Sequence, residues 1–330
     1  MTQLTESVAG NRSGVAVRAD GGRVAFAESG PWNGYPIFFL HGTPGSRIGV
    51  LPRPFELSRR RVRLIAIDRP GYGMSDRRAG RDVASVAQDV LAVAEELGLA
   101  TFSVSGRSGG GPHALACGAL LPDRVRSVVA LVSIAPYDAP GLDWYAGMID
   151  SNVAAYRLTR AALDNPALMP AMKLSLAVDT GALATDFIAE RLFDELPVAD
   201  RRIVSDTRIR GLLLAGFRNA VTNPDNLIAL DPAELALDPA EPVPTYLAGQ
   251  FDDHVAFCSP WGFDPADIRC PTLVWHGGTD VHSPPSHSRW LASRIPHAVL
   301  DVDPGEAHFG AVRYFPHLLG WMVKAGAQVR

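Results

Sequence analysis

A serine placed between glycines, directly after a strand-like apolar run and directly before a helical pattern, constrains the fold of this chain most strongly. The run Phe102–Val104 leads into Gly106–Gly110, and Ala114–Leu121 then has a helical composition. A turn this sharp between a strand and a helix strains the residue at its corner, and flanking glycines remove Cβ atoms that would collide. The pattern predicts that Ser108 is presented outward as a nucleophile.

The same pattern predicts where a developing negative charge on the substrate is stabilised. Pro112 fits the first turn of the expected helix, and the N-terminus of that helix directs partial positive charge toward an oxyanion. The Gly109 N–H is therefore one expected donor. The second is the Thr43 N–H, because Gly42 lets the loop after the apolar run Ile37–Leu40 turn closely. An ordinary Pro-Gly turn remains the alternative for this loop.

Short apolar runs alternate with helix-length amphipathic segments along the chain. Five continuous apolar runs are typical of parallel strands covered on both faces: Ile37–Leu40, Leu64–Ile67, Phe102–Val104, Val128–Ile134 and Thr272–Trp275. Asp82–Leu97 has apolar residues at three- and four-residue spacing and ends at Gly98, which predicts a crossover helix. Val15–Arg18 and Val24–Ala27 predict a hairpin at the start. The alternation indicates a doubly wound α/β sheet.

The alternation stops after Pro136 and resumes at Ile268, and the stretch between them contains helical patterns without a convincing buried strand. We therefore expect a core domain formed by residues 1–136 and 266–330. Residues 137–265 are expected to form a helical cap, or lid, inserted into that core.

The first cap helix is expected to open with Trp144, Tyr145 and Met148, on an apolar stripe that continues to Tyr156. Most apolar stripes pack as core, and we assign that role to most cap residues. A minority should line a pocket, and these three residues are the candidates for contact with the substrate.

Composition and charge exclude several classes of partner. The chain has 31 Lys and Arg against 35 Asp and Glu, a formal net charge of −4, and its scattered arginines form no basic face for nucleic acid. Its apolar runs are too short to span a membrane. Neither the three cysteines nor the histidines show metal-ligand spacing, so we expect no metal and no cofactor. The first fourteen residues lack the pattern of a secretory signal, which predicts a cytoplasmic protein of undetermined oligomeric state.

With these motifs and the segment Asp68–Ser75, which reads Asp-Arg-Pro-Gly-Tyr-Gly-Met-Ser, the chain resembles the α/β-hydrolase superfamily, specifically its capped serine hydrolases. The resemblance is strong over about 37–134 and 271–309 and weak in the cap. It implies an eight-stranded, mostly parallel sheet and the catalytic order serine, acid, histidine. Arg69 and its neighbour Asp68 are expected to brace loops.

The resemblance directs attention to Asp280, after the run ending in Trp275, as the acid that would orient a histidine. His308, in the loop Gly305–Phe309 after the strand-like run Val299–Val302, looks like the general base. Some family members carry the acid after the sixth strand, which leaves Asp138 as the alternative. The family often has a second glycine where this chain has Glu306.

The resemblance implies hydrolysis of a small, largely apolar ester, thioester or lactone through an acyl-enzyme on Ser108. Hydrolysis of a carbon–carbon bond or removal of an N-terminal residue from a peptide would use the same triad, and a hydrolase-fold receptor would bind a small ligand in the same pocket. Epoxide hydrolases and haloalkane dehalogenases are disfavoured, because they carry aspartate at the position of Ser108. Arg107 is a candidate contact for a negative charge on the substrate, although a solvated side chain is the simpler interpretation.

Overall fold

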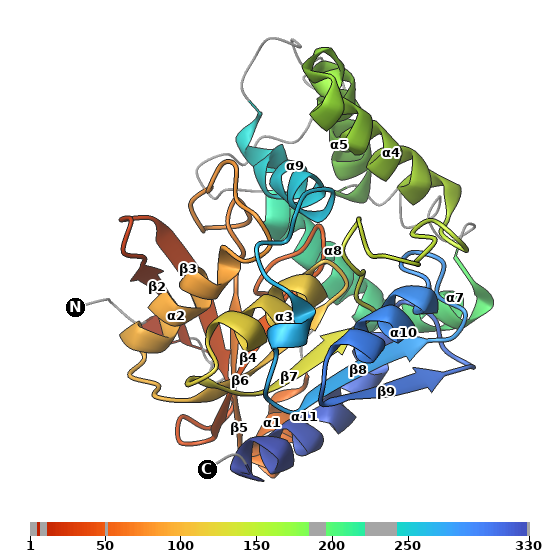
Figure 1. Ribbon diagram of the computed structural model, residues 1–330. Helices are drawn as coiled ribbons and strands as arrows, with labels where there is room; N and C mark the ends of the chain where they lie inside the picture. The colour runs from red at the N-terminus through yellow and green to blue at the C-terminus, as the bar shows by residue number, and fades with distance from the viewer. Residues whose placement is uncertain (1–4, 7–11, 50–51, 185–195, 222–242, 329–330) are drawn as a thin grey trace.

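The computed structural model describes residues 5–6, 12–49, 52–184, 196–221 and 243–328 (Figure 1). Its central sheet has the strand order β1-β2-β3-β5-β4-β6-β7-β8-β9. The strands are β1 Thr5–Glu6, β2 Arg12–Val17, β3 Arg23–Ser29, β4 Tyr35–Leu40, β5 Val62–Ile67, β6 Phe102–Arg107, β7 Val125–Leu131, β8 Thr272–Gly277 and β9 Ala298–Asp303. The eight predicted strands are β2–β9, and the two-residue β1 extends the edge beside β2.

The sheet is parallel from β5 through β9, and β1, β2 and β3 are antiparallel to their neighbours. The predicted hairpin is confirmed, because Val17 of β2 pairs with Arg23 of β3. Parallel strands place their carboxyl ends at one edge, so the segments that follow β4, β6, β7, β8 and β9 gather there. These segments contain every residue predicted for the chemistry.

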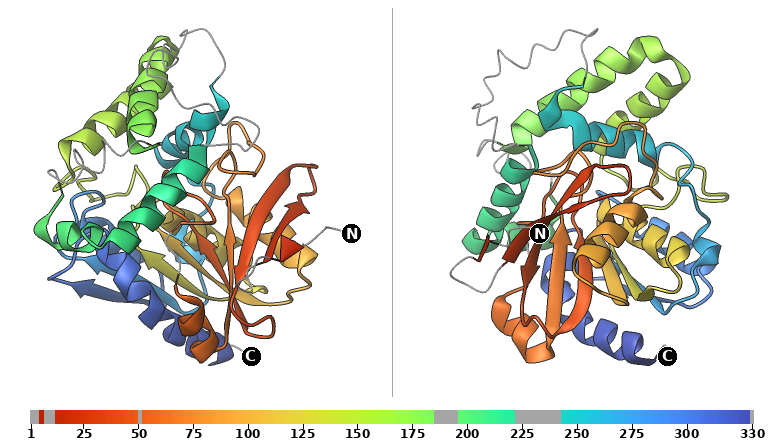
Figure 2. Two further views of the ribbon diagram at one scale, coloured as in Figure 1. Left: turned by 180° about the vertical axis from the view of Figure 1, so that it is seen from behind. Right: turned by 90° about the vertical axis from the view of Figure 1, so that its left-hand side faces the viewer.

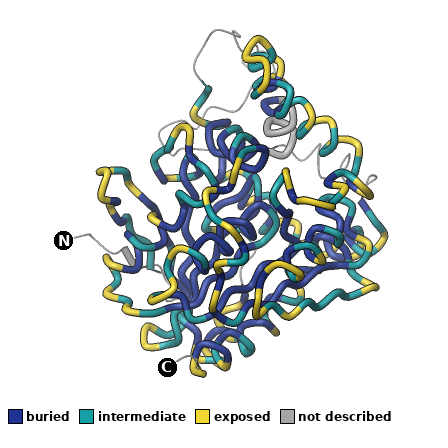
Figure 3. The backbone as a smooth tube through the Cα atoms, viewed as in Figure 1, coloured by how far each residue is buried: buried dark blue, intermediate teal, exposed yellow. Residues whose placement is uncertain are grey.

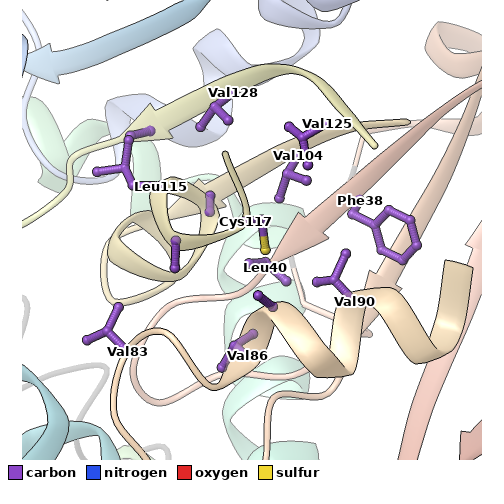
Figure 4. Packing of buried hydrophobic residues seen from close by; sticks show 14 of the residues in the cluster. Phe38, Leu40, Val83, Val86, Val90, Val104, Leu115, Cys117, Val125 and Val128 are labelled. Atoms are coloured by element: carbon purple, nitrogen blue, oxygen red, sulfur yellow. The ribbon is translucent and has the colours of Figure 1, made fainter. Parts of the chain in front are cut away.

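Helices cover both faces of the sheet, which explains why its strands are continuously apolar. They are α1 Pro54–Arg60, α2 Val86–Glu96, α3 Gly110–Leu120, α10 Pro285–Arg294 and α11 Gly310–Gln328. Residues of α2, α3 and α10 pack on one face and residues of α1 and α11 on the other. Figure 4 shows Val86 and Val90 of α2 beside Leu40 and Phe38 of β4, and Leu115 of α3 belongs to the same cluster. Burying each such side chain contributes about 1.5–3 kcal/mol.

Helix α2 and strand β7 have other limits than the sequence predicts. The helix expected from Asp82 begins at Val86, because Asp82 Oδ1 accepts hydrogen bonds from the Ser85 N–H at 2.8 Å and the Ser85 hydroxyl at 2.5 Å, which close a turn ahead of the helix. Strand β7 ends at Leu131, three residues before the predicted end, because Val132 has a φ of 44° that a strand cannot contain.

A helical insertion connects β7 to β8. Its described elements are α4 Asp150–Asp164, η1 Pro166–Leu168, α5 Met169–Ala184, α7 Val198–Val204, α8 Thr207–Val221, α9 Thr245–Phe257 and η2 Pro265–Asp267. Figures 1 and 2 show α4, α5 and α9 standing above the sheet, and Figure 3 shows that many of the described residues of α4 and α5 are exposed or only partly buried. The described part of the insertion contains no strand. The exact domain limits at 137 and 265 remain a prediction.

Candidate active site

Ser108 occupies the corner between β6 and α3 and has a φ of 54°, which is a strained conformation for a residue with a side chain. A Cβ atom on Gly106 would lie 2.0 Å from the Gly110 carbonyl oxygen, so glycine is required there. Two hydrogen bonds hold the corner: the Ser108 N–H donates to the Leu131 oxygen at 2.8 Å, and the Gly111 N–H donates to the Ser108 oxygen at 2.8 Å. The backbone thus has the geometry expected of a nucleophile elbow.

The two predicted oxyanion donors come from segments that meet beside Ser108. A Cβ atom on Gly42 would lie 3.8 Å from Ser108 Oγ, so the loop after β4 passes directly over the serine. A Cβ atom on Gly109 would lie 2.1 Å from Thr43 Oγ1, which places the Thr43 and Gly109 segments in contact. Backbone N–H groups from two such segments are suited to stabilise an oxyanion. Their catalytic role remains a prediction.

Arg69 fixes the loop that carries Thr43. This fully buried arginine donates from Nε to the His41 oxygen at 3.1 Å and from Nη2 to the Gly42 oxygen at 3.0 Å. It also donates from Nη2 to Thr43 Oγ1 at 3.0 Å. The expectation that Arg69 braces a loop is therefore confirmed.

Asp253 of α9 connects the insertion to this loop. Its Oδ1 accepts from Arg69 Nη1 at 2.6 Å and also from Arg81, and its Oδ2 accepts from the Tyr72 hydroxyl at 2.7 Å and from the Thr43 hydroxyl. Burial opposes ionisation, but the two guanidinium groups hold the pKa of Asp253 well below its usual range. Asp253 is absent from the residues predicted from the sequence, because nothing near it in the chain indicates a partner 184 residues away.

The structure brings His308 to Asp280. His308 Nδ1 lies 2.8 Å from Asp280 Oδ2, whereas Asp138 is exposed in the turn region after β7. Because Nδ1 faces a carboxylate, it carries the ring proton, and Nε2 keeps a lone pair that can accept a proton. Of the two carboxylates that the sequence left open, only Asp280 has the geometry to orient His308.

The surroundings of Asp280 keep it ionised. Oδ1 accepts from the His282 N–H at 2.8 Å and the Ser283 N–H at 3.1 Å, and Oδ2 lies 3.1 Å from His276 Nε2. Burial opposes the charge, but His308 and the hydrogen bonds from His276 and His308 hold the pKa of Asp280 well below its ordinary value. A permanently charged acid can stabilise a histidine that becomes protonated during a reaction.

The end of β7, the next residue Val132, and Ser283 connect the serine corner to the histidine. The Leu131 oxygen accepts from the Ser108 N–H, and the next carbonyl, that of Val132, accepts from Ser283 Oγ at 2.8 Å. Ser283 Oγ also lies 3.3 Å from His308 Nδ1. The hydrogen bonds found within the described ranges do not include one between Ser108 Oγ and His308, and in unliganded enzymes such bonds are often long.

Arg107 lies on the face of the sheet that α11 covers, beside Phe39, Leu131 and Phe315. Burial lowers the pKa of its guanidinium to about 10. Its Nη1 is buried without a hydrogen-bond partner among the described residues. Arg107 is half-buried, so its guanidinium is only partly solvated, and its contact with a charged substrate remains a prediction.

The segment from Trp144 to Met148 is not helical. Helix α4 begins only at Asp150, because Gly147, with a φ of +81°, turns the chain ahead of it. Trp144 and Met148 are buried in the main hydrophobic core, and Tyr145 is partly buried against it. Their contact with a substrate remains a prediction, but their packing gives Trp144 a structural role that its helical spacing did not indicate.

Replacing Trp144 by Ala is expected to lower the free energy of unfolding by about 3–5 kcal/mol, the range for truncating a buried aromatic residue. The indole packs 4.8 Å from Tyr156 and 5.0 Å from His287 between ring centres, and its Nε1 donates to the Ala135 oxygen at 2.9 Å. Urea denaturation measures the loss. Tyr145→Phe, which removes only a hydroxyl, is the control with an expected loss below about 1.5 kcal/mol. Equal losses in the two variants would contradict the packing role.

Neither a metal cluster nor a membrane-spanning helix is found among the described residues. No group of three or more His, Cys, Asp or Glu side chains in these ranges is arranged to hold a metal ion. None of the helices described is both long and apolar enough to cross a membrane.

Comparison with known proteins gives matches over most of the chain. The family profile described as alpha/beta hydrolase fold matches residues 35–312. The non-heme chloroperoxidase of Streptomyces lividans is 31% identical over 125 residues, which cover 37% of this chain and 45% of that protein. The match thus spans less than half of that relative's length.

Two solved structures have the same fold over nearly their whole length. A thermophilic esterase from Thermogutta terrifontis, with malate bound, superposes with a TM-score of 0.62 at 20% identity and covers 98% of this chain and 99% of its own. The enol-lactonase from Burkholderia xenovorans LB400 superposes with a TM-score of 0.59 at 18% identity, and the superposition covers 94% of this chain and 98% of the lactonase chain. Together with the profile match over well more than half of the sequence, they show that this chain belongs to the α/β-hydrolase fold family.

Proposed function

We propose that this protein is a serine hydrolase that cleaves an ester-type acyl bond with Ser108 as nucleophile, His308 as general base and Asp280 as orienting acid. One observation carries the proposal: Ser108 is held at a positive φ between a strand and a helix. Such strain in a non-glycine residue persists where the surrounding structure enforces it, and it concentrates at functional sites. The His308–Asp280 pair at the same edge of the sheet supplies the matching base.

The proposed reaction has two halves. Ser108 Oγ attacks the acyl carbonyl while its proton moves to His308 Nε2, and the Thr43 and Gly109 N–H groups stabilise the oxyanion. The protonated His308, stabilised by Asp280, then gives its proton to the leaving alcohol or thiol. Water, deprotonated by His308, attacks the acyl-enzyme carbonyl. The bond between the acyl carbon and Ser108 Oγ then breaks, His308 returns the proton to Ser108 Oγ, and the carboxylic acid leaves.

Apolar side chains beside the histidine favour a largely apolar substrate. Phe309, next to His308 in the chain, packs with a cluster that joins α7, α8 and α11: Leu196, Val204, Ile209, Leu212, Leu213, Phe217 and Val312. Its partly buried members beside His308, such as Phe309, can bind substrate groups through the apolar area that they remove from water. The similar structures of an esterase and an enol-lactonase favour an ester or lactone as the bond that is cleaved.

We expect the purified protein to hydrolyse small chromogenic esters, such as p-nitrophenyl acetate and butyrate. Because the apolar cluster adjoins His308, kcat/KM should rise from acetate to butyrate, by up to about 4-fold per methylene if each adds about 0.8 kcal/mol of buried area. Steady-state kinetics over an acyl-length series, with a thioester and a lactone in parallel, measures this. Binding of these compounds without turnover by folded protein would instead indicate a receptor.

A further inference from the structure

The helical insertion supplies a buried carboxylate to the backbone of the histidine loop. Asp200 of α7 is fully buried, and its Oδ2 accepts from the His308 N–H at 3.2 Å while its Oδ1 accepts from the Phe309 N–H at 2.7 Å. These N–H groups directly precede α11, where free donors and partial positive charge collect. Asp200 thus caps α11 from a position 108 residues before His308.

Helix α7 is itself held against this loop. Leu196 and Val204, on either side of Asp200, pack in one cluster with Phe309 and Val312. Arg201 Nε of α7 donates to the oxygen of Leu196, which lies just before the helix, at 2.8 Å. The carboxylate therefore has a fixed place relative to the loop that it binds.

We propose that Asp200 is a positioning residue for His308, so that the insertion sets the place of the general base. The inference rests on the proposed function of His308. Asp280 fixes the ring through Nδ1, and Asp200 fixes the backbone from which the ring projects. With only the ring contact, the imidazole can move with the loop, and a displacement of about 1 Å from the reacting atoms lowers rates by about 10²-fold.

The electrostatic cost of this arrangement supports a role beyond stability. Burial raises the pKa of Asp200 to about 6, with His308 and the backbone N–H groups opposing the rise and Asp280 adding to it. The pKa of an aspartate is about 3.9 in the unfolded chain, and that of Asp200 is about 6 in the folded protein. Between these two pH values the unfolded state ionises before the folded state does, so the free energy of unfolding falls as the pH rises. At pH 7 the ionised Asp200 therefore destabilises the fold, and groups kept under such a penalty concentrate at functional sites.

The test compares Asp200→Asn and Asp200→Ala with the wild type at pH 8. Asparagine keeps the shape and one acceptor oxygen, so we expect kcat to fall about 10-fold, and alanine removes both acceptors, so we expect about 10²-fold. KM should change less than kcat, because the proposed effect is on the position of the general base. The downfield ¹H resonance of the His308 Nδ1 proton, read by NMR without substrate, should shift or broaden in both variants.

Asp252→Asn is the matched control. Asp252 is also a nearly buried aspartate of the insertion that binds the core, and it accepts from Arg77 Nε at 2.9 Å and Nη2 at 2.8 Å without reaching the histidine loop. If Asp200 acts through His308, Asp252→Asn keeps kcat within about 2-fold of wild type and leaves the Nδ1 resonance unchanged.

Two results would overturn the proposal: wild-type kcat and an unchanged Nδ1 resonance in folded Asp200→Asn, or equal losses of kcat in Asp200→Asn and Asp252→Asn. If Asp200→Ala does not fold, the kcat and the Nδ1 resonance of the isosteric Asp200→Asn variant test the proposal. Failure of the proposed function is a separate result, because it shows in the wild type as a lack of ester turnover. The NMR comparison tests the positioning of His308 in that case as well.

Discussion

Replacing Ser108 by Ala is expected to lower kcat for p-nitrophenyl butyrate by about 10³- to 10⁶-fold, the range for the loss of a catalytic nucleophile. The strained corner presents the hydroxyl, and alanine keeps the corner's packing while removing the atom that attacks. The oxyanion loop and the His308–Asp280 pair remain in place, so some residual rate above that of water is expected.

Single-turnover and steady-state kinetics measure this loss, and circular dichroism verifies that the variant is folded. Ser293→Ala is the matched control, because Ser293 is an exposed serine of α10 that donates to the Trp290 oxygen. It should keep the wild-type kcat. A Ser108→Ala variant within about 10-fold of wild type would rule out covalent catalysis by this residue.

Replacing Asp280 by Asn is expected to lower kcat by about 10⁴-fold, as an amide in place of a triad acid favours the wrong histidine tautomer. The new side-chain amide would face His308 Nδ1 with either an oxygen or two N–H donors, and neither arrangement stabilises the imidazolium as a carboxylate does. The buried partners His276 and Ser283 would lose a charged acceptor as well.

Asp138→Asn serves as the comparison, because Asp138 follows β7, where some members of the family carry the catalytic acid. Its exposed position predicts kcat within about 2-fold of wild type. A larger loss in Asp138→Asn than in Asp280→Asn, at equal thermal stability, would show that the acid is misassigned.

Much of the framework follows from local sequence signals. The apolar runs locate the strands, and the glycines around Ser108 permit its sharp turn. The carboxyl ends of β8 and β9 lie side by side in the sheet, so Asp280 and His308 meet once the strand order is known. That order follows from the family resemblance, because apolar runs alone do not state which strands are neighbours.

The sequence is less informative about the insertion. Spacing of apolar residues predicts a helix at Trp144, but Gly147 takes a left-handed conformation that glycine alone adopts readily, and the helix begins after it. Asp200 and Asp253 each bind a core loop through pairs 108 and 184 residues apart. No local pattern marks such a pair, because the chemistry of each aspartate is set by its distant partner.

Asp200 and Asp253 change the role that the sequence suggests for the insertion. The residues predicted for the chemistry all lie outside 137–265, which suggests that the insertion only selects the substrate. However, Asp253 binds the loop of Thr43 and Asp200 binds the loop of His308. We therefore expect truncation of the insertion to lower kcat on every ester and not only to relax selectivity.

The site of covalent labelling decides whether Ser108 is the nucleophile. The protein is incubated with a fluorophosphonate, digested, and read by peptide mass spectrometry. We expect one phosphonyl adduct on Ser108, lost in Ser108→Ala and strongly slowed in Asp280→Asn, with the esterase activity falling in step with labelling. An adduct on another residue, or full activity after Ser108 is modified, would contradict this assignment.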